Sequence, residues 1–189
     1  MKHTAATAAA LALLAVVGCS QGQGTGAEGG SLRGRDEAAA GCPADRAVYA
    51  LRASPGPELR FVRFARPEVS NLALHLRVDD KDYWYWLSES QGYGSISATL
   101  GPNPTDDIED PPQFEAEAID NGPFTAFSAT FDVIPRAPRI GDPSPAHVFA
   151  PDMGVSIWFA TSDTEARTFL PVAMWDFDRC APAEDEAAP

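Results

Sequence analysis

Period-two alternation of apolar residues is the feature that most restricts what this chain can fold into. From Leu72 to Val78, leucines and the final valine occupy every second position, and His75 and Arg77 fall between them. This spacing puts the apolar residues on one face of a β-strand and the polar residues on the other. Comparable runs predict further strands over residues 47–53, 59–65, 83–88, 95–100, 113–119, 124–134, 155–160 and 168–177.

Proline and glycine separate these runs. Turn-forming stretches such as residues 54–57, 101–104 and 121–123 lie between the expected strands. No stretch combines a sustained 3.6-residue period with helix caps. Closely spaced strands with frequent turns predict an all-β fold, a single antiparallel β-sandwich or barrel-like domain over residues 42–180.

The N-terminal segment has the pattern of a secretory signal. Lys2 and His3 make a short basic start, and an apolar run follows from Ala5 to Val17. The run is shorter than the roughly 20 apolar residues of a membrane-spanning helix. A basic start, a short apolar run and a small residue at its end are typical of a signal that is cleaved on export.

Residues 16–19, Val-Val-Gly-Cys, resemble the lipobox of bacterial lipoproteins, in which a small residue precedes an invariant cysteine. The resemblance covers residues 1–20 and implies that residues 1–18 are removed and that Cys19 becomes an acylated N-terminus. Several acyl chains there would anchor the protein stably in a membrane. Ser20 implies, through the same resemblance, an outer-membrane location facing the periplasm if the host is Gram-negative. An ordinary cleaved signal with a chance cysteine is the alternative.

The segments outside the expected strands have few large apolar residues. Residues 19–41 are rich in Gly, Ala and Gln and are predicted to form a flexible linker after the lipidated cysteine. Residues 181–189 are predicted to form a disordered acidic tail. Neither segment can bury enough apolar surface to fold alone.

Cys42 and Cys180 remain once Cys19 is assigned to the lipid. An even pair of cysteines in an exported protein predicts a disulfide. The two cysteines flank nearly all of the expected strands, so a bridge would join the first and last strands of the domain. Two separate free thiols are the alternative.

The formal net charge of −13 disfavours nucleic acid and anionic lipid surfaces as partners. Asp106, Asp107, Glu109 and Asp110 form the densest acidic stretch and offer the oxygen ligands that calcium prefers, but not in the order of an EF-hand loop. A weak calcium site and a solvated acidic loop both remain open. No other cofactor is predicted, because the chain contains no phosphate-binding glycine loop or dinucleotide-binding motif.

Few residues are available for catalysis. His75 and His147 are the histidines that remain after cleavage, and the chain has no Gly-x-Ser-x-Gly motif. Ser95 lies in an expected turn, and nothing pairs it with a base. We therefore predict no catalytic residues.

An aromatic hairpin is the candidate binding site. The polar residues 79–82 are expected to form its turn. The expected cross-strand pairs are Val78 with Tyr83, Arg77 with Trp84, His75 with Trp86 and, across the following turn, Tyr85 with Ile96.

One face of these strands is apolar and should belong to the core. The other face presents a candidate ligand surface made of Trp84, Trp86, His75, Arg77, Ser95 and Ser97. Arg77 over Trp84 would add a cation–π contact of about 0.5–1 kcal/mol if exposed. An aromatic surface with polar neighbours suits a carbohydrate, a peptide or an envelope protein. The alternative is that a second layer buries both tryptophans.

Two functions follow from these features. The first is a non-enzymatic binding or interaction module that a lipid on Cys19 holds on a membrane of the cell envelope. The second is an envelope hydrolase acting on a polysaccharide or peptide polymer, which would need a polar constellation around His75 or His147. The sequence favours the first.

Overall fold

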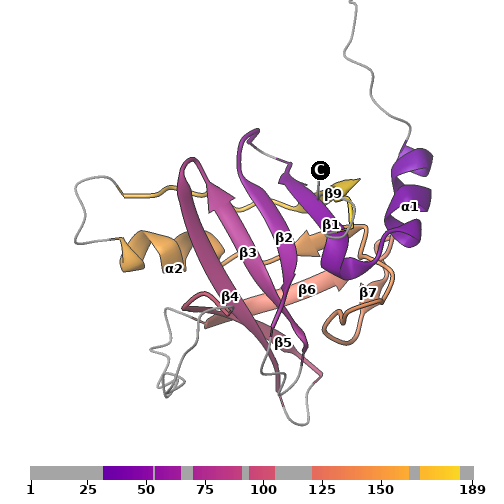
Figure 1. Ribbon diagram of the computed structural model, residues 1–189. Helices are drawn as coiled ribbons and strands as arrows, with labels where there is room; N and C mark the ends of the chain where they lie inside the picture. Colours follow the sequence, from indigo (N-terminus) through magenta and orange to yellow (C-terminus); the bar gives the residue numbers. More distant parts are fainter. Residues whose placement is uncertain are drawn as a thin grey trace, which may run out of the picture.

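The computed structural model describes residues 32–52, 54–64, 70–90, 94–104, 121–161 and 167–183 (Figure 1). These residues form two α-helices, nine β-strands and one short 3-10 helix, Ala44–Arg46. In chain order the helices and strands are α1 (Leu32–Gly41), β1 (Ala47–Leu51), β2 (Glu58–Arg63), β3 (Leu72–Val78), β4 (Lys81–Glu89), β5 (Ile96–Gly101), β6 (Asn121–Phe127), β7 (Val133–Ile134), β8 (His147–Phe149), α2 (Met153–Ala160) and β9 (Trp175–Cys180).

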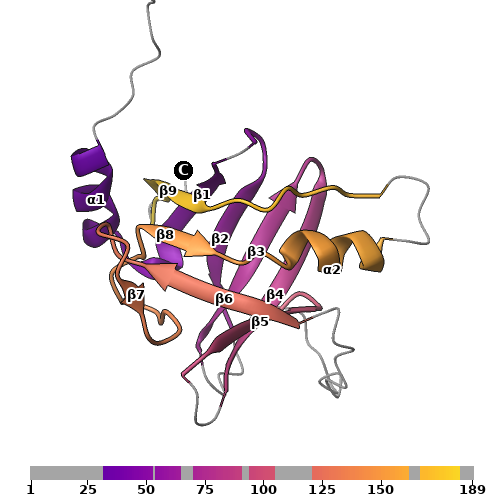
Figure 2. The ribbon, with the colours of Figure 1, turned by 180° about the vertical axis from the view of Figure 1, so that it is seen from behind.

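Eight of these strands close into an antiparallel barrel, which confirms the predicted all-β, barrel-like fold. The order around the barrel is β1, β2, β3, β4, β5, β6, β8, β9, and β9 pairs with β1. We call this last pairing the closing seam. β7 pairs with the end of β6 outside the ring of eight. In Figure 2, β6, β8 and β9 lie in front of the meander β1 to β5.

The barrel interior is filled by the side chains that alternate inward along each strand. Leu72, Leu74 and Leu76 of β3 are all buried, as their spacing predicts. Aromatic rings from facing strands meet between them, and the centroids of the Tyr49 and Phe61 rings are 5.7 Å apart, edge to face. An eight-stranded barrel is just wide enough to be filled in this way. A functional surface is therefore to be sought on the outside of the barrel.

α2 packs beside β4, and here the prediction of a strand over residues 155–160 is wrong. Met153, Ser156 and Ile157 follow helical spacing and are buried. The Tyr85 hydroxyl donates to the Met153 carbonyl oxygen over 3.0 Å. A short apolar run fits a strand and a buried helix equally well. Because the outward side of α2 is also apolar, the hydrophobic periodicity of this run does not distinguish a strand from a helix.

The prediction of a strand over residues 168–177 is wrong in its start, because β9 begins at Trp175. The preceding residues run along α2 instead, and the Thr168 backbone N–H donates to Thr161 Oγ1 over 3.4 Å. Gly154 lies directly against this segment, since a Cβ there would come within 2.3 Å of the Leu170 carbonyl oxygen. A larger residue at position 154 would push the segment away from α2.

α1 occupies residues 32–41, where the sequence predicts the end of the flexible linker. The last turn of α1 docks on the domain: Ala39 is buried, and Ser144 Oγ donates to its carbonyl oxygen over 2.6 Å. Three consecutive alanines favour a helix here and are small enough to pack closely. α1 and α2 lie on opposite sides of the barrel in both views (Figures 1 and 2).

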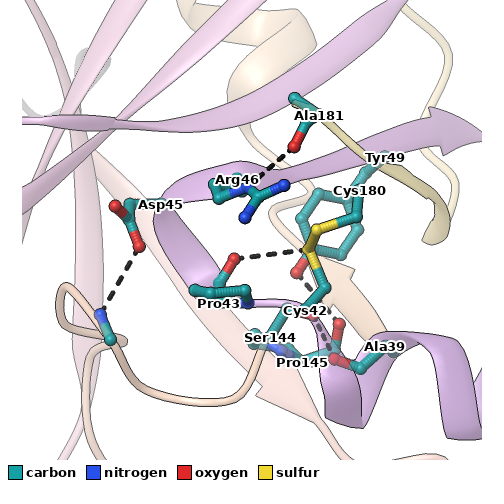
Figure 3. The surroundings of a disulfide bond; sticks show 11 residues. Ala39, Cys42, Pro43, Asp45, Arg46, Tyr49, Ser144, Pro145, Cys180 and Ala181 are labelled. Carbon is teal, nitrogen blue, oxygen red and sulfur yellow. Dashed lines mark hydrogen bonds between the residues drawn. A yellow bond between two sulfur atoms is a disulfide. The ribbon is translucent and has the colours of Figure 1, made fainter. Parts of the chain in front are cut away.

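The predicted disulfide is confirmed, with the Cα atoms of Cys42 and Cys180 5.7 Å apart. Cys42 precedes β1 and Cys180 ends β9, so the bridge lies at the closing seam (Figure 3). Arg46 Nε donates to the Ala181 carbonyl oxygen over 2.8 Å at the same place. The Tyr49 hydroxyl donates to the Pro145 carbonyl oxygen over 2.9 Å, and burial raises the pKa of this tyrosine.

The expected strand over residues 124–134 is two strands, β6 and β7, separated by a turn. Ser128 Oγ accepts the backbone N–H groups of Thr130 and Asp132 over 3.2 and 3.1 Å, which fixes the turn. Phe131 has a φ of 63°, in the left-handed region that bulky residues rarely adopt. The expected strand over residues 113–119 lies outside the described residues.

Candidate functional site

The outer face of β3 and β4 carries the aromatic side chains that the sequence predicts as a ligand surface. Cross-strand pairing sets two rows there, one of Arg60, His75, Trp84 and Gly101 and the next of Val62, Ala73, Trp86 and Thr99. Phe64, just after β2, adds a ring beside Trp86. We call Phe64, Trp86, Trp84 and His75 the aromatic strip.

Trp84 and His75 stack as a cross-strand pair. Their ring centroids are 5.3 Å apart and their planes differ by 13°. Nε2 of His75 lies 2.7 Å from Asp82 Oδ1. The Asp82 carboxylate thus orients the imidazole, and the imidazole in turn supports one side of the indole.

Trp86 is held from two sides. Its indole N–H donates to the Pro102 carbonyl oxygen over 3.0 Å, and its ring centroid is 4.8 Å from that of Phe64. Gly101 makes room for it, since a Cβ there would come within 3.2 Å of Trp86 Nε1. Trp84 and Trp86 both stay partly exposed, which fits an accessible aromatic surface; binding itself stays a prediction.

Charged side chains border the aromatic strip. Glu58 accepts hydrogen bonds from Arg60, over 2.6 Å, and from Arg179 of β9. Partial burial alone would raise the pKa of Glu58, but the two guanidinium groups outweigh it and lower that pKa. Arg77 and Asp82 stand opposite one another on the same outer face and are exposed. The strip therefore has both cations and a firmly ionised carboxylate at its edge.

The predicted register of the hairpin is wrong by two residues. Residues 79–80 alone form the turn, so Val78 pairs with Lys81. Asp79 has a φ of 56°, a left-handed conformation that Asp tolerates better than most residues. A shift of two residues keeps every side chain on its predicted face. The faces are therefore as predicted, and the individual pairs are not.

Three residues of the predicted ligand surface, Arg77, Ser95 and Ser97, do not lie beside Trp84 or Trp86 as expected. The ring beside Trp84 is His75, and Arg77 pairs with Asp82, so the expected cation–π contact is replaced by a ring stack. β4 continues to Glu89, which puts Ser97 opposite Ser88 and leaves Ser95 in the connection beyond it. Thr99 and Gly101 take the places expected for the serines, because the sequence gives no sign that β4 is longer than its apolar run.

Sequence reasoning missed a second polar cluster on the outer face of β8 and β9. Asp176 accepts hydrogen bonds from Arg52 over 2.8 and 2.6 Å and lies 2.7 Å from His147 Nδ1. Partial burial alone would raise the pKa of Asp176, but Arg52 and His147 outweigh it and lower that pKa. The Phe131 ring stacks on His147, with 4.3 Å between centroids. β8 has three residues, too few for alternation to reveal it in the sequence.

Each histidine of the barrel thus binds a carboxylate. In the described part of the chain, no serine or threonine hydroxyl forms a hydrogen bond with the imidazole of His75 or His147. A hydrolytic dyad needs a nucleophile within such reach of its base. The contacts that the structure shows for the two imidazoles are with carboxylates and with aromatic rings.

Cys19 and the acidic group Asp106, Asp107, Glu109 and Asp110 lie outside the described residues. Within the residues that the structure describes, no three His, Cys, Asp or Glu side chains gather as a metal site. No helix among them is both long and apolar enough to cross a bilayer.

No family model matches the chain, and no curated protein or solved structure matches it either.

Proposed function

We propose that this chain is a lipid-anchored protein of a bacterial cell envelope and that its barrel is a binding module. The leader, with its lipobox-like residues 16–19, supports the anchor. A disulfide between Cys42 and Cys180 suits an oxidising compartment outside the cytoplasm. In a Gram-negative host, Ser20 favours the outer membrane, with the barrel facing the periplasm.

The observation that carries the binding role is the partly exposed aromatic strip with its charged border. Rigid aromatic rings offer a large contact area at small entropic cost. The ligand class that fits best is a carbohydrate, because a sugar ring can stack its C–H face on an indole while its hydroxyl groups reach Arg60 and Asp82. An envelope hydrolase is the alternative function, and the contacts of His75 and His147 give it no support.

Replacing Cys19 with Ala should abolish acylation and release the barrel from membranes, because the thiol is the proposed attachment point. Metabolic labelling with a tagged fatty acid, followed by membrane fractionation, measures both effects. A Cys42→Ala chain is the matched control and should still be labelled. Equal labelling of the wild type and the Cys19→Ala chain would contradict the proposed anchor.

Replacing Trp84 and Trp86 together with Ala should weaken binding to isolated peptidoglycan about 5-fold to 150-fold, since each stacked ring is worth about 0.5–1.5 kcal/mol. Co-sedimentation measures the change, and far-UV circular dichroism with cooperative urea unfolding verifies the fold. Trp158→Ala, which removes a tryptophan from α2, is the control and should bind as the wild type does.

Binding that is unchanged in the Trp84→Ala, Trp86→Ala chain, with the fold intact, would rule out the aromatic strip as the ligand surface. Binding to peptides, to an envelope protein or to the peptide stems of peptidoglycan, with none to its glycan strands, would refute the carbohydrate class and keep the binding role.

A further inference from the structure

A second exposed surface lies on α2 and on the segment that follows it. Val155, Trp158 and Phe159 share one side of α2 and are exposed, although the buried side of this helix is also apolar. Phe169 and Val172 add side chains that are 73% and 62% exposed. We call these five residues the apolar end patch.

The two parts of the patch are fastened to each other and to the barrel. Close packing of Gly154 against Leu170 joins the segment to α2. The Tyr83 hydroxyl, from β4, lies 2.7 Å from Thr168 Oγ1. Single exposed apolar residues are common on proteins, but a fixed group of five is typical of an interaction surface.

Cationic side chains accompany the patch on a strongly acidic protein. The Arg167 guanidinium lies 4.7 Å from the centre of the Trp158 ring, and no carboxylate among the described residues pairs with it. Lys81 Nζ lies 3.3 Å from Thr168 Oγ1. The patch thus combines aromatic rings with cations, although the whole chain has a net charge of −13.

We propose that the apolar end patch docks on the surface of the bilayer to which the chain is tethered, at a region of mainly zwitterionic lipid. Tryptophan and phenylalanine side chains partition into the headgroup region, and arginine can keep its charge at the phosphates while its stem stays among apolar groups. The same net charge that disfavours an anionic membrane also disfavours a second copy, because two copies would repel and would bring their Arg167 side chains together.

The membrane is within reach, and this step rests on the proposed anchor at Cys19. Twelve residues, 20–31, separate Cys19 from α1, and such a length spans at most about 40 Å. A compact domain of this size is about 35–40 Å across. When extended, the tether is therefore long enough to join α1, on one side of the barrel, to a bilayer that contacts α2 on the other side. Docking is then intramolecular, but a tether stretched close to its full length gives only a small effective concentration, so the five side chains of the patch have to supply most of the binding.

Depth-dependent fluorescence quenching tests the proposal without relying on acylation. The mature chain, with a hexahistidine tag in place of Cys19, is held on phosphatidylcholine vesicles by a nickel-chelating lipid, and some acyl chains carry bromine. Tryptophan fluorescence should be quenched in the wild type, and the quenched component should be lost in a Trp158→Phe chain. A Phe169→Asp, Val172→Asp chain should also lose it while staying bound through its tag. Trp84→Phe, on the aromatic strip, is the control and should keep the quenching.

Equal quenching in the wild-type and Trp158→Phe chains, or no quenching in either, would overturn the proposal. Shielding of Trp158 from aqueous acrylamide that grows with protein concentration in the absence of vesicles would assign the patch to a second copy instead. A failure of the anchor would appear in the fatty-acid labelling of Cys19 and not in this assay.

Discussion

Replacing Cys42 and Cys180 together with Ala should lower the free energy of unfolding by about 2–4 kcal/mol, with about 5 kcal/mol as the upper figure from chain entropy. The two cysteines are 138 residues apart in the chain, so opening the bridge gives the unfolded chain much conformational freedom. Urea unfolding at equilibrium, followed by tryptophan fluorescence, measures the loss.

A reductant supplies the control for this prediction. It should bring the stability of the wild type down to that of the double variant and leave the variant unchanged. Equal stability of the wild type and the double variant, or an effect of reductant on the variant, would mean that the bridge contributes nothing or that the substitutions act in another way.

Replacing Trp175 with Ala should cost about 3–5 kcal/mol, the range for removing a large buried aromatic side chain. Trp175 is 1% exposed and pairs with Leu51 of β1 and Val148 of β8. The cavity would open beside the closing seam, where only strands from the two ends of the chain meet. Urea unfolding reports the change in free energy.

Phe169→Ala is the matched control for Trp175→Ala. It removes an aromatic ring from the same C-terminal part of the chain, but from a side chain that is 73% exposed, so its effect should stay within about 0.5 kcal/mol. Comparable losses in the two variants would show that burial at β9 does not decide the stability.

The sequence predicts the strands well wherever one face is buried and the other is not. β3 is the clearest case, since its three leucines and Val78 point into the core and Arg77 points out. Alternation is a local property that survives in any all-β arrangement, so it cannot distinguish a sandwich from a barrel. The pairing of β5 with β6 and of β9 with β1, which closes the ring, depends on contacts that no local pattern encodes.

The sequence predicts which face of the sheet carries the candidate site, but it does not predict which residues pair across the strands. Trp84 and Trp86 share a face because they are two residues apart, whatever the register. Their neighbours depend on turn lengths, and Lys81 belongs to a strand although its charge is typical of a turn. The apolar end patch escaped prediction for a related reason: residues 155–160 read as a core strand, because apolar composition does not say which side faces water.

The closing seam has a consequence for the order in which the protein can form. Strands β1 to β5 each pair with the next strand along the chain, so this half can assemble before the C-terminal strands are in place. The second edge of β1 stays unpaired until β9, the last strand, is in place. An unpaired edge is a template for pairing with other chains. Cys42 likewise cannot form its disulfide until Cys180, the last residue of β9, is in place. We therefore expect the yield of folded protein to depend on how the incomplete barrel is protected from other chains during that interval, since the finished barrel no longer exposes this edge of β1.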